Sequence, residues 1–394
     1  MSIYQEAKEM EQQLLTWREQ IHHHPELGKK LPQTTALVKS VLDELGIPWE
    51  ELIPCGIVGV IGKPEGKRIL LRADMDALPM SEETGLPFAS ECDGVMHSCG
   101  HDCHTSMLLT AAALLKRHEN ELKGQVILMF QPDEEGTEGG GARVMVEAGL
   151  LEKYKPDVAM MAHMASDVVK TNQILFKSGP SSASSDRFTV KLRGKGGHGA
   201  RPHQSINPIL CAMKIAEAFT DIGRYEVDVQ QPTALSICTF HSGTASNIIP
   251  EECVFSGTLR TFNEEVRQFT LERMRQVSAE IAQAYRCQLD LELYSGTPAL
   301  ICDPAFSNKA RDWAYEGLHG DGADVPPISY EKSMGSEDFA FISSRIPSCS
   351  ISVGSTSHQD QVYPLHHPKI IFDEAGLCAG AAAYAQVAYS YLTE

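Results

Sequence analysis

The sequence has no long apolar run and no excess of positive charge. No segment approaches the ~18 uninterrupted apolar residues that a spanning helix needs, which excludes a membrane-spanning helix. The chain carries 34 lysines and arginines against 52 aspartates and glutamates, a formal net charge of −18. Because nucleic-acid binding needs a basic face, this balance argues against a nucleic-acid partner. The polar, amphipathic start, MSIYQEAKEMEQQLLTWREQ, lacks the pattern of a secretory signal, so we expect a cytoplasmic protein.

The cysteines lack the pattern of a disulfide framework. There are eleven, an odd number, and most lie singly in apolar runs, as Cys211 does in NPILCAMKIA and Cys349 in PSCSISV. Buried free thiols behave as small hydrophobic side chains. The exception is HSCGHDCH, from His97 to His104, which places three histidines, two cysteines and an aspartate in eight residues.

At 394 residues, the chain exceeds the usual size of one hydrophobic core, so two domains are expected. An amphipathic helix is expected over 4–23, and short apolar strands then alternate with helices, which predicts an α/β domain with a largely buried sheet. In the middle of the chain, four strands alternate polar and apolar residues, with helical patterns near 207–222 and 264–285. This pattern predicts a smaller α+β domain with a four-stranded sheet and two helices.

We expect residues 1–181 and 296–394 to form the α/β domain and residues 182–295 to form the insert. The small-residue stretch SGPSSASSDR, from Ser178 to Arg187, is interpreted as a hinge or linker between them.

Carboxylates and imidazoles follow three strand-like runs, in RADMDALP (72–79), in QPDEEG (131–136) and at His163 after DVAMMA. Functional groups in open α/β sheets gather at the carboxyl ends of strands, so these segments can converge on one crevice. HSCGHDCH precedes a helix expected to start near His104 or Thr105, and its side chains can meet the same crevice from one edge.

Simpler explanations exist for each cluster. Adjacent carboxylates such as Glu134 and Glu135 are usually solvated, but these two follow a buried strand and a Gln-Pro turn. A structural zinc site would need a second Cys/His pair at the proper separation. Cys99 and Cys103 are separated by three residues, whereas a thioredoxin-like redox pair is separated by two. We interpret the histidines of HHHPE (22–26) as surface helix residues, and HHP (366–368) is ambiguous by itself.

Seven motifs together carry a resemblance, and they occur in the order RADMDALP, HSCGHDCH, QPDEEG, KGGHGARPH, GTASNIIP, GSEDFA and PLHHP. They resemble the metallo-amidohydrolases of the aminoacylase and carboxypeptidase family, in the branch of hippurate hydrolases and auxin-conjugate hydrolases. The resemblance implies a zinc-peptidase-like α/β catalytic domain with a mixed central sheet. It also implies two divalent metal ions per subunit, and an inserted domain that acts as a lid and as the homodimerisation surface.

The resemblance assigns the metal ligands, which are Cys99, His101, Glu135, His163 and His366. His366 is preferred to His367 because the family pattern is Leu-His-x-Pro. One thiolate, one carboxylate and three imidazoles suit zinc, manganese or nickel. Asp76 and Asp102 would orient the ligand imidazoles.

The resemblance also assigns the catalytic roles. Glu134 would be the general base, accepting a proton from the attacking water and passing it to the leaving amine. His198, supplied by the lid of the partner subunit, would stabilise the oxyanion. Asn247 and Arg260 would bind the substrate, and the bidentate fork of Arg260 suits a carboxylate. A strand-end salt bridge explains Arg260 equally well.

The predicted reaction is metal-dependent hydrolysis of the amide bond in a small N-acyl amino acid (acetyl, benzoyl or similar) to a carboxylic acid and a free amino acid. A dipeptidase or carboxypeptidase is an alternative, although no acidic group is clearly available for a free α-amino group. A non-catalytic metal- or ligand-binding protein on this fold would be favoured by loss of the first glutamate, and Glu134 is present. A metal-storage or thiol-redox role is disfavoured because the other cysteines are scattered.

Overall fold

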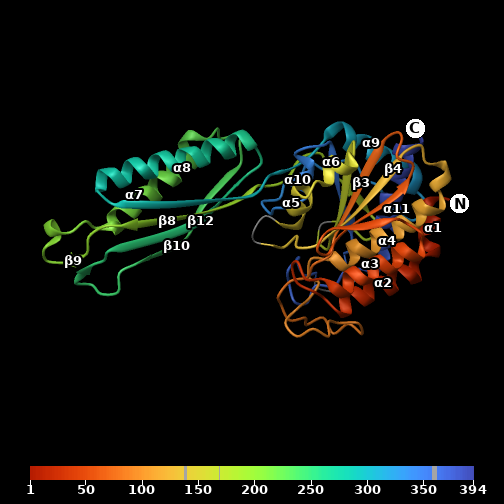
Figure 1. Ribbon diagram of the computed structural model, residues 1–394, viewed down its shortest axis with the longest axis horizontal. Coiled ribbons are helices and arrows are strands. Elements are labelled where there is room, and N and C mark those ends of the chain that lie inside the picture. Colours follow the sequence, from red (N-terminus) through yellow and green to blue (C-terminus); the bar gives the residue numbers. More distant parts are fainter. Residues whose placement is uncertain (137–139, 168, 357–361) are drawn as a thin grey trace. The chain divides into compact units, whose positions relative to one another are not determined.

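The computed structural model describes residues 1–136, 140–167, 169–356 and 362–394. These residues form two compact units (Figure 1). Unit 1 comprises Met1–Gly179, Ile301–Glu331 and Asp338–Glu394, and unit 2 comprises Pro180–Leu300 and Lys332–Glu337. The chain therefore passes from the first unit to the second and back more than once.

Unit 1 is built on a seven-stranded mixed sheet in the order β1-β2-β4-β3-β5-β15-β6. The four central strands β4, β3, β5 and β15 are parallel, while β1, β2 and β6 run antiparallel to their neighbours. Their bounds are β1 Trp49–Ile53, β2 Gly56–Gly62, β3 Arg68–Asp74, β4 Gln125–Gln131, β5 Val158–Ala165, β6 Ile174–Phe176 and β15 Ser348–Gly354. The parallel strands end at a common edge, and the predicted mixed α/β architecture is confirmed.

Helices cover both faces of this sheet. The larger core joins α4 and α11 to alternate strand residues such as Leu71 and Phe130. On the opposite face, α5 contacts β4 and α10 contacts β15. The helix bounds are α1 Ile3–Glu9, α2 Glu11–His23, α3 Pro32–Glu44, α4 His101–Arg117, α5 Gly140–Glu147, α6 Leu150–Tyr154, α9 Pro304–Leu318, α10 Ala340–Ser343 and α11 Leu377–Thr393. With both faces covered, the central strands are continuously apolar, as their sequences predict.

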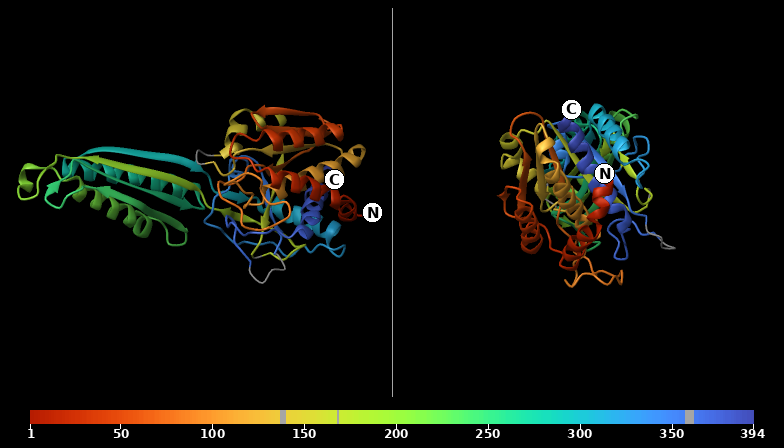
Figure 2. Two further views of the ribbon diagram at one scale, coloured as in Figure 1. Left: turned by 90° about the horizontal axis from the view of Figure 1, so that it is seen from below. Right: turned by 90° about the vertical axis from the view of Figure 1, so that its right-hand side faces the viewer.

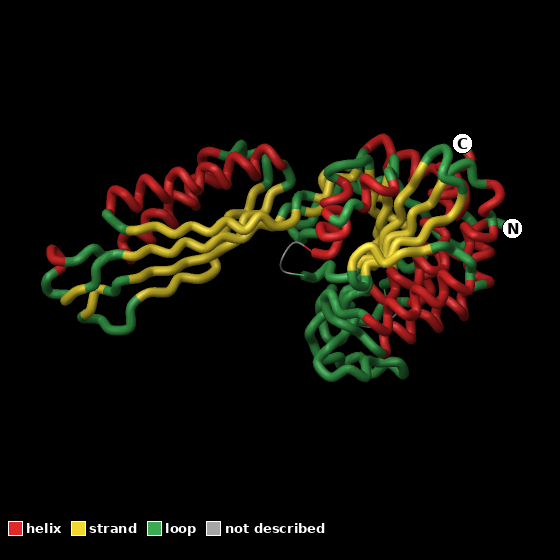
Figure 3. Tube along the Cα trace, in the orientation of Figure 1, coloured by secondary structure: helices red, strands yellow, loops and turns green. Residues whose placement is uncertain are grey.

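Unit 2 is a four-stranded antiparallel sheet in the order β10-β12-β8-β13, with both long helices on one face (Figures 1 and 3). Alternate residues of β12 are buried, and Phe188, Phe219 and Phe255 form the centre of the core beneath the helices. The bounds are β8 Ser185–Arg193, β10 Thr233–Ser242, β12 Glu252–Thr261, β13 Gln288–Thr297, α7 Pro208–Asp221 and α8 Glu264–Tyr285. Period-2 alternation thus marks a sheet with one covered face.

One local expectation was wrong. The N-terminal helix is broken at Met10 into α1 and α2, because α1 packs on α11 whereas α2 packs on α4. Helices α1 and α11 contact each other, and both chain ends lie in unit 1 (Figures 1 and 2). The stretch Ser178–Arg187 contains the passage from unit 1 to unit 2, between Gly179 and Pro180. Most of it is strand, in β7 (Gly179–Ser182) and in the start of β8, and β7 pairs with β14 (Leu300–Cys302).

Two further strands, β9 (Gly197–His198) and β11 (Ile248–Ile249), form a small ribbon in unit 2. None of the helices in the described ranges is both long enough and apolar enough to cross a membrane.

Candidate metal centre

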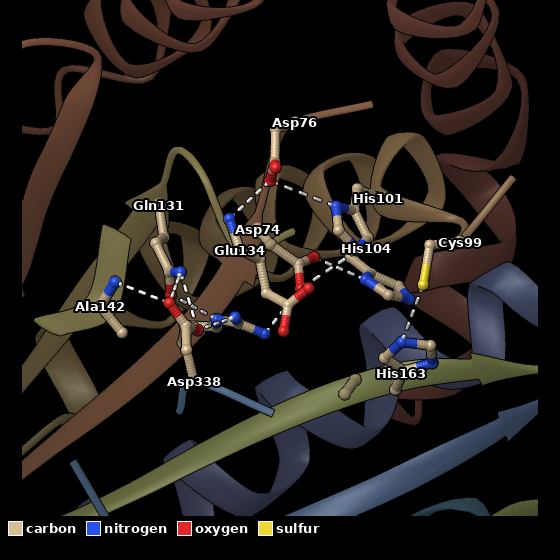
Figure 4. Close-up of polar contacts among 12 residues, drawn as sticks. Asp74, Asp76, Cys99, His101, His104, Gln131, Glu134, Ala142, His163 and Asp338 are labelled. Carbon is tan, nitrogen blue, oxygen red and sulfur yellow. Dashed lines mark hydrogen bonds and ion pairs between the residues drawn. The ribbon is translucent and has the colours of Figure 1, made fainter. Parts of the chain in front are cut away.

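The polar ends of three parallel strands and the first turn of α4 meet at one edge of the sheet in unit 1. β3 ends at Asp74, β4 ends at Gln131 just before the glutamate pair, and His163 lies near the end of β5. Figure 4 shows side chains from all four segments gathered in this region. The convergence expected from the strand pattern is therefore present.

Helix α4 begins earlier than the sequence suggested. It starts at His101, and Gly100 before it has a left-handed backbone with φ of 86°. A Cβ atom at this position would lie 2.9 Å from Cγ of Met164, so glycine permits both the turn and the close approach to β5. Because the helix starts here, His101 and His104 lie on its first turn and face the ends of the strands.

The five predicted metal ligands lie together in two groups. Cys99, His101 and His163 form one group, and Cys99, Glu135 and His366 form the other, with the ligand atoms of each group within 4.8 Å of one another. Cys99 belongs to both groups, since its Sγ lies 3.4 Å from Nε2 of His163 and 3.3 Å from Nε2 of His366. Two cations that share one thiolate would fit this arrangement.

The hydrogen-bond partners of the His163 and His101 ring nitrogens also fit metal binding. Nδ1 of His163 donates to the backbone carbonyl of Met164 at 2.8 Å, so the lone pair of Nε2 faces Cys99. Ligating histidines commonly donate their second nitrogen to a carbonyl in this way. Both ring nitrogens of His101 are buried and have no hydrogen-bond partner among the described residues. A cation would satisfy one of them.

Negative charge surrounds the two groups. Burial acts to lower the pKa of His101, but the nearby carboxylate of Asp74 and the Cys99 thiol group raise it well above its ordinary value. Burial acts to raise the pKa of Glu135, but His366 and His101 lower it below the usual range. A site with several carboxylates and few cations of its own attracts divalent metal ions.

Burial raises the pKa of the Cys99 thiol. A reactive or redox-active cysteine instead needs a lowered pKa and some exposure. Cys103, the other cysteine of the motif, is also buried with a raised pKa. These properties argue against a cysteine nucleophile or a redox pair here.

The two histidines of the HHP sequence have different surroundings. His366 lies beside the candidate ligands, with Nε2 3.1 Å from Oε1 of Glu135. His367 instead stacks on Tyr363, with ring centroids 4.3 Å apart. The structure thus places the preferred histidine in the cluster.

Asp76 and Asp102 have different partners. Asp76 accepts hydrogen bonds from the backbone N–H groups of Glu134 and Glu135, at 2.9 and 3.1 Å, and its carboxylate lies 3.4 Å from Nδ1 of His101. Asp76 therefore fixes the loop of the glutamate pair and faces one candidate ligand. Asp102 accepts hydrogen bonds from Arg18 and His22 at 2.8 Å each, and neither of these residues is a proposed ligand.

The interpretation of the HHHPE histidines as surface residues was wrong for His22. This side chain is 2% exposed, and Arg18 one turn earlier is 1% exposed. Both lie on the face of α2 that also buries Leu14 and Ile21. The i, i+4, i+7, i+8 spacing of these four residues was the signal that could have identified the buried face.

Sequence reasoning also missed His104, which lies close to the ligands without the properties of one. Its Nε2 accepts the backbone N–H of Met164 at 2.8 Å, so in the neutral ring the proton is on Nδ1, which donates to Asp74 at 2.6 Å. Burial lowers the pKa of His104 to about 4, which keeps the ring neutral. Since both nitrogens are engaged, His104 connects Asp74 to β5 and leaves no lone pair for a metal.

In unit 2, two of the three predicted substrate-contacting residues lie together. His198 on β9 pairs with Ile248 on β11, next to Asn247, and these residues line a shallow hollow. Nδ1 of His198 accepts the backbone N–H of Ala200 at 3.1 Å, so the neutral ring carries its proton on exposed Nε2. Among the described residues no acceptor is bound to that N–H, and an oxyanion needs a donor of this kind.

Arg260 lies elsewhere in unit 2. It is near the end of β12, paired with Ala234, whereas β9 and β11 adjoin the start of that strand. Glu252 and Arg260 are eight positions apart along the strand, about 26 Å at the usual rise. Within one chain, Arg260 therefore does not share a small-molecule site with His198 and Asn247.

Comparison with known proteins identifies the class to which this fold and site belong. Residues 70–390 match the model of peptidase family M20/M25/M40, and the chain belongs to this family. It is therefore a hydrolase that acts on amide bonds, and the family resemblance carried by the seven motifs is confirmed.

Three proteins are similar to this chain over most of its length. The chain is 37% identical to an N-acetyl-L-cysteine deacetylase of Bacillus subtilis (strain 168), over 93% of this chain and 85% of that protein. It is 34% identical to thermostable carboxypeptidase 1 of Saccharolobus solfataricus, over 98% of this chain and 97% of that protein. The crystal structure of the Bacillus subtilis YXEP protein, described as a dinuclear metal-binding peptidase of the M20 family, superposes with a TM-score of 0.82 at 33% identity, covering 98% and 99% of the two chains.

Proposed function

We propose that this protein hydrolyses the amide bond of small N-acyl amino acids, releasing a carboxylic acid and a free amino acid, with two divalent metal ions per subunit. The observation that carries the proposal is the pair of ligand groups that share Cys99, with Glu134 beside them in the sequence and in space. The two glutamates have different roles. Glu135 belongs to a ligand group, and Glu134 provides the carboxylate for proton transfer.

The reaction needs a water molecule, a polarised carbonyl and a route for one proton. The two metal ions, when bound, lower the pKa of the attacking water and polarise the amide carbonyl. Glu134 accepts the proton that water loses as its oxygen bonds to the carbonyl carbon. The same carboxylate then delivers this proton to the amine nitrogen as the C–N bond breaks. Asp76 holds the Glu134 backbone N–H at 2.9 Å and so fixes the base within the site.

The other roles are assigned to unit 2. The Nε2–H of His198 would donate to the oxyanion, Asn247 would contact the same part of the substrate, and Arg260 would pair with the carboxylate of the amino acid. The separation of Arg260 from His198 along β12 supports a site that takes Arg260 from one subunit and His198 with Asn247 from its partner. The protein would then work as a homodimer that joins through unit 2.

The surface of unit 2 supports this assembly. Strand β10 is an edge of the sheet, and it exposes 41% of Phe240. Helix α7 exposes Leu210 and Met213 by 52% and 55%. Exposed apolar side chains next to an unpaired strand edge are typical of a surface that another chain covers.

A carboxypeptidase activity is the second candidate, favoured by the similarity to the thermostable carboxypeptidase. An N-acyl amino acid and a peptide C-terminus share the amide bond and the free carboxylate of the leaving amino acid. They differ only on the acyl side, where a peptide carries further residues. The same catalytic groups therefore serve both substrates, and the acyl pocket decides between them.

The test is release of free amino acid by metal-loaded protein from N-acetyl amino acids, N-benzoyl amino acids and dipeptides, measured beside the variant Glu134→Gln. We expect turnover of an N-acyl substrate, and a loss of at least ~10²-fold in kcat for the variant, because the amide cannot accept the proton. The variant should keep its metal, since it leaves all five assigned ligands unchanged. Equal activity of the two proteins would refute the role of Glu134, and turnover of dipeptides alone would favour the carboxypeptidase.

A further inference from the structure

The motif GSEDFA, residues 335–340, is one of the seven motifs that carry the family resemblance, but it supplies none of the assigned ligands or catalytic residues. Its aspartate, Asp338, lies just before α10 in unit 1 and is 2% exposed. A carboxylate buried to this degree needs several donors to compensate for the loss of water. The identity of those donors indicates what the residue does.

The Asp338 carboxylate accepts hydrogen bonds from three different parts of unit 1. Nη2 of Arg72, on β3, donates to Oδ1 at 2.9 Å. Nε2 of Gln131, the last residue of β4, lies 2.9 and 2.7 Å from the two carboxylate oxygens. The backbone N–H of Ala142, in the first turn of α5, donates to Oδ2 at 2.9 Å. Figure 4 shows Gln131 and Ala142 next to the Asp338 carboxylate.

Gln131 and Ala142 lie on the two sides of the loop that carries Glu134 and Glu135. One side is the end of β4 and the other is the start of α5, and Asp338 binds both. The approach is close, because a Cβ atom at Gly140 would lie 2.1 Å from Oδ2 of Asp338. Gly140 also has a positive φ of 72°, so a glycine there meets both requirements. Asp338 thus closes the base of the catalytic loop.

The contact with Arg72 extends toward the metal ligands. Arg72 is fully buried, and its Nη1 donates to Oδ2 of Asp74 at 2.7 Å while its Nε donates to Gln131 at 2.8 Å. Oδ1 of Asp74 accepts from Nδ1 of His104, and Nε2 of His104 accepts from the Met164 N–H. Met164 follows His163 directly and accepts the hydrogen bond that orients its ring.

Asp74 faces a second ligand as well. Its Oδ2, the atom bound by Arg72, lies 3.6 Å from Nε2 of His101. The guanidinium of Arg72 is planar and offers donors in a fixed fork, so it sets the positions of both carboxylates that it joins. A buried network of this kind contributes little net stability, but it defines a single arrangement of the groups that it connects.

We propose that Asp338 is a positioning residue of the metal centre, which holds the Glu134–Glu135 loop through Gln131 and Ala142 and holds His163 and His101 through Arg72 and Asp74. This inference rests on the proposed function, because it takes those residues as the base and the ligands. In this scheme, Asp338 itself does not contact the substrate or the metal ions. Its effect is on the affinity and geometry with which the two metal ions are bound.

The experiment compares cobalt(II) binding by the full-length wild-type protein and the variant Asp338→Asn, followed by visible absorption during titration at controlled free metal. The amide keeps the size of the carboxylate but presents an N–H₂ group to donors that need an acceptor. We expect affinity to fall by about 10- to 100-fold, as is usual when groups supporting metal ligands are removed. The charge-transfer band of the Cys99 thiolate and the ligand-field bands should also change, since the positions of the ligands are altered.

The matched control is Asp186→Asn in unit 2. Asp186 is fully buried and is bound by both Nε and Nη2 of Arg267 at 2.7 Å, so it is also a buried carboxylate paired with an arginine. This variant should lose stability and yet bind cobalt with unchanged affinity and an unchanged spectrum. A merely structural role for Asp338 would give the same result as the control, and that outcome would overturn the proposal.

A second variant decides the question if Asp338→Asn does not fold. Gly140→Ala changes no charge, but its methyl group displaces the Asp338 carboxylate from the base of the loop. Weaker cobalt binding by this variant would support the proposal, and wild-type binding would overturn it. If the wild-type protein itself does not bind two ions, the proposed metal centre fails. If the wild type and both variants bind two ions equally, only the role of Asp338 fails.

Discussion

Cys99 has the central place among the candidate ligands. Its sulfur lies 3.4 Å from one imidazole nitrogen and 3.3 Å from another, and these belong to different ligand groups. A thiolate between the two ligand groups would supply negative charge that favours divalent cations in both, which a neutral side chain cannot do. The remaining ligands, in contrast, each belong to one of the two groups that share this residue.

We therefore expect Cys99→Ser to lose both metal ions and His163→Ala to weaken the binding of one. The measurement is the metal content per chain by elemental analysis, after dialysis against a defined concentration of free metal. Circular dichroism controls for folding in both variants. Retention of two ions by Cys99→Ser would show that the sulfur is not shared.

At the scale of elements, helix α2 is tied to the start of α4 by buried charges. Arg18 and His22 of α2 both bind Asp102, in the first turn of α4, and His22 also contacts Glu82 at 3.3 Å in the loop between β3 and α4. Burial acts to raise the pKa of Glu82, but hydrogen bonds from His22, Thr84 and the Ser90 N–H lower it to about 2. Burial acts to lower the pKa of His22, but the carboxylates of Asp102 and Glu82 raise it above its ordinary value.

These shifts predict how the contribution of Glu82 depends on pH. A carboxylate with a depressed pKa stabilises the fold above its unfolded pKa, near 4.5, and loses that contribution as the pH falls toward 2. A histidine with a raised pKa contributes below its unfolded value, near 6.5, and loses that contribution as the pH rises through its folded value. The difference in unfolding free energy between the wild type and Glu82→Gln should therefore be largest between about pH 5 and 6.5.

Urea unfolding of the metal-free proteins from pH 3.5 to 8.5 measures this difference on both sides of the expected maximum. We expect the difference to narrow toward both ends of the range. Glu272→Gln, an exposed glutamate on α8, serves as a control that should show no such maximum. A difference that is constant with pH would mean that Glu82 contributes through packing alone.

At the scale of the whole molecule, the proposed homodimer has a consequence for paired variants. If each site uses Glu134 of one subunit and His198 of the other, the homodimers of Glu134→Gln and His198→Ala are both impaired at every site. In a heterodimer of the two variants, one site carries both substitutions and the other carries neither. The intact site is then expected to restore about half the activity of a wild-type dimer.

Co-expression with two affinity tags gives the heterodimer in pure form, and release of amino acid measures its activity. Restored activity would require His198 to act across the dimer. If His198 acted within its own subunit, each site of the heterodimer would carry one defect and no activity would return. A monomeric wild-type protein in sedimentation equilibrium would refute the assembly before the activity is measured.

Some of the site follows directly from local sequence. The ligands fall in short motifs at the ends of apolar strands, so HSCGHDCH and QPDEEG could be assigned to one crevice. The start of α4 was misplaced because apolar periodicity begins only after His104, whereas Gly100 sets the first turn three residues earlier. His22 was misjudged because a histidine beside two others suggests a surface, and its burial depends on Asp102, eighty residues away.

The sequence alone therefore determined the family, the mixed α/β architecture and the segments from which the candidate ligands come, because each depends on residue types within a few positions of one another. The tertiary structure decided which atoms meet. It assigned Cys99 to both ligand groups, closed the glutamate loop with Asp338, and separated Arg260 from His198. These contacts join residues that lie far apart in the chain, and only the packing of strands and helices sets the distances between them.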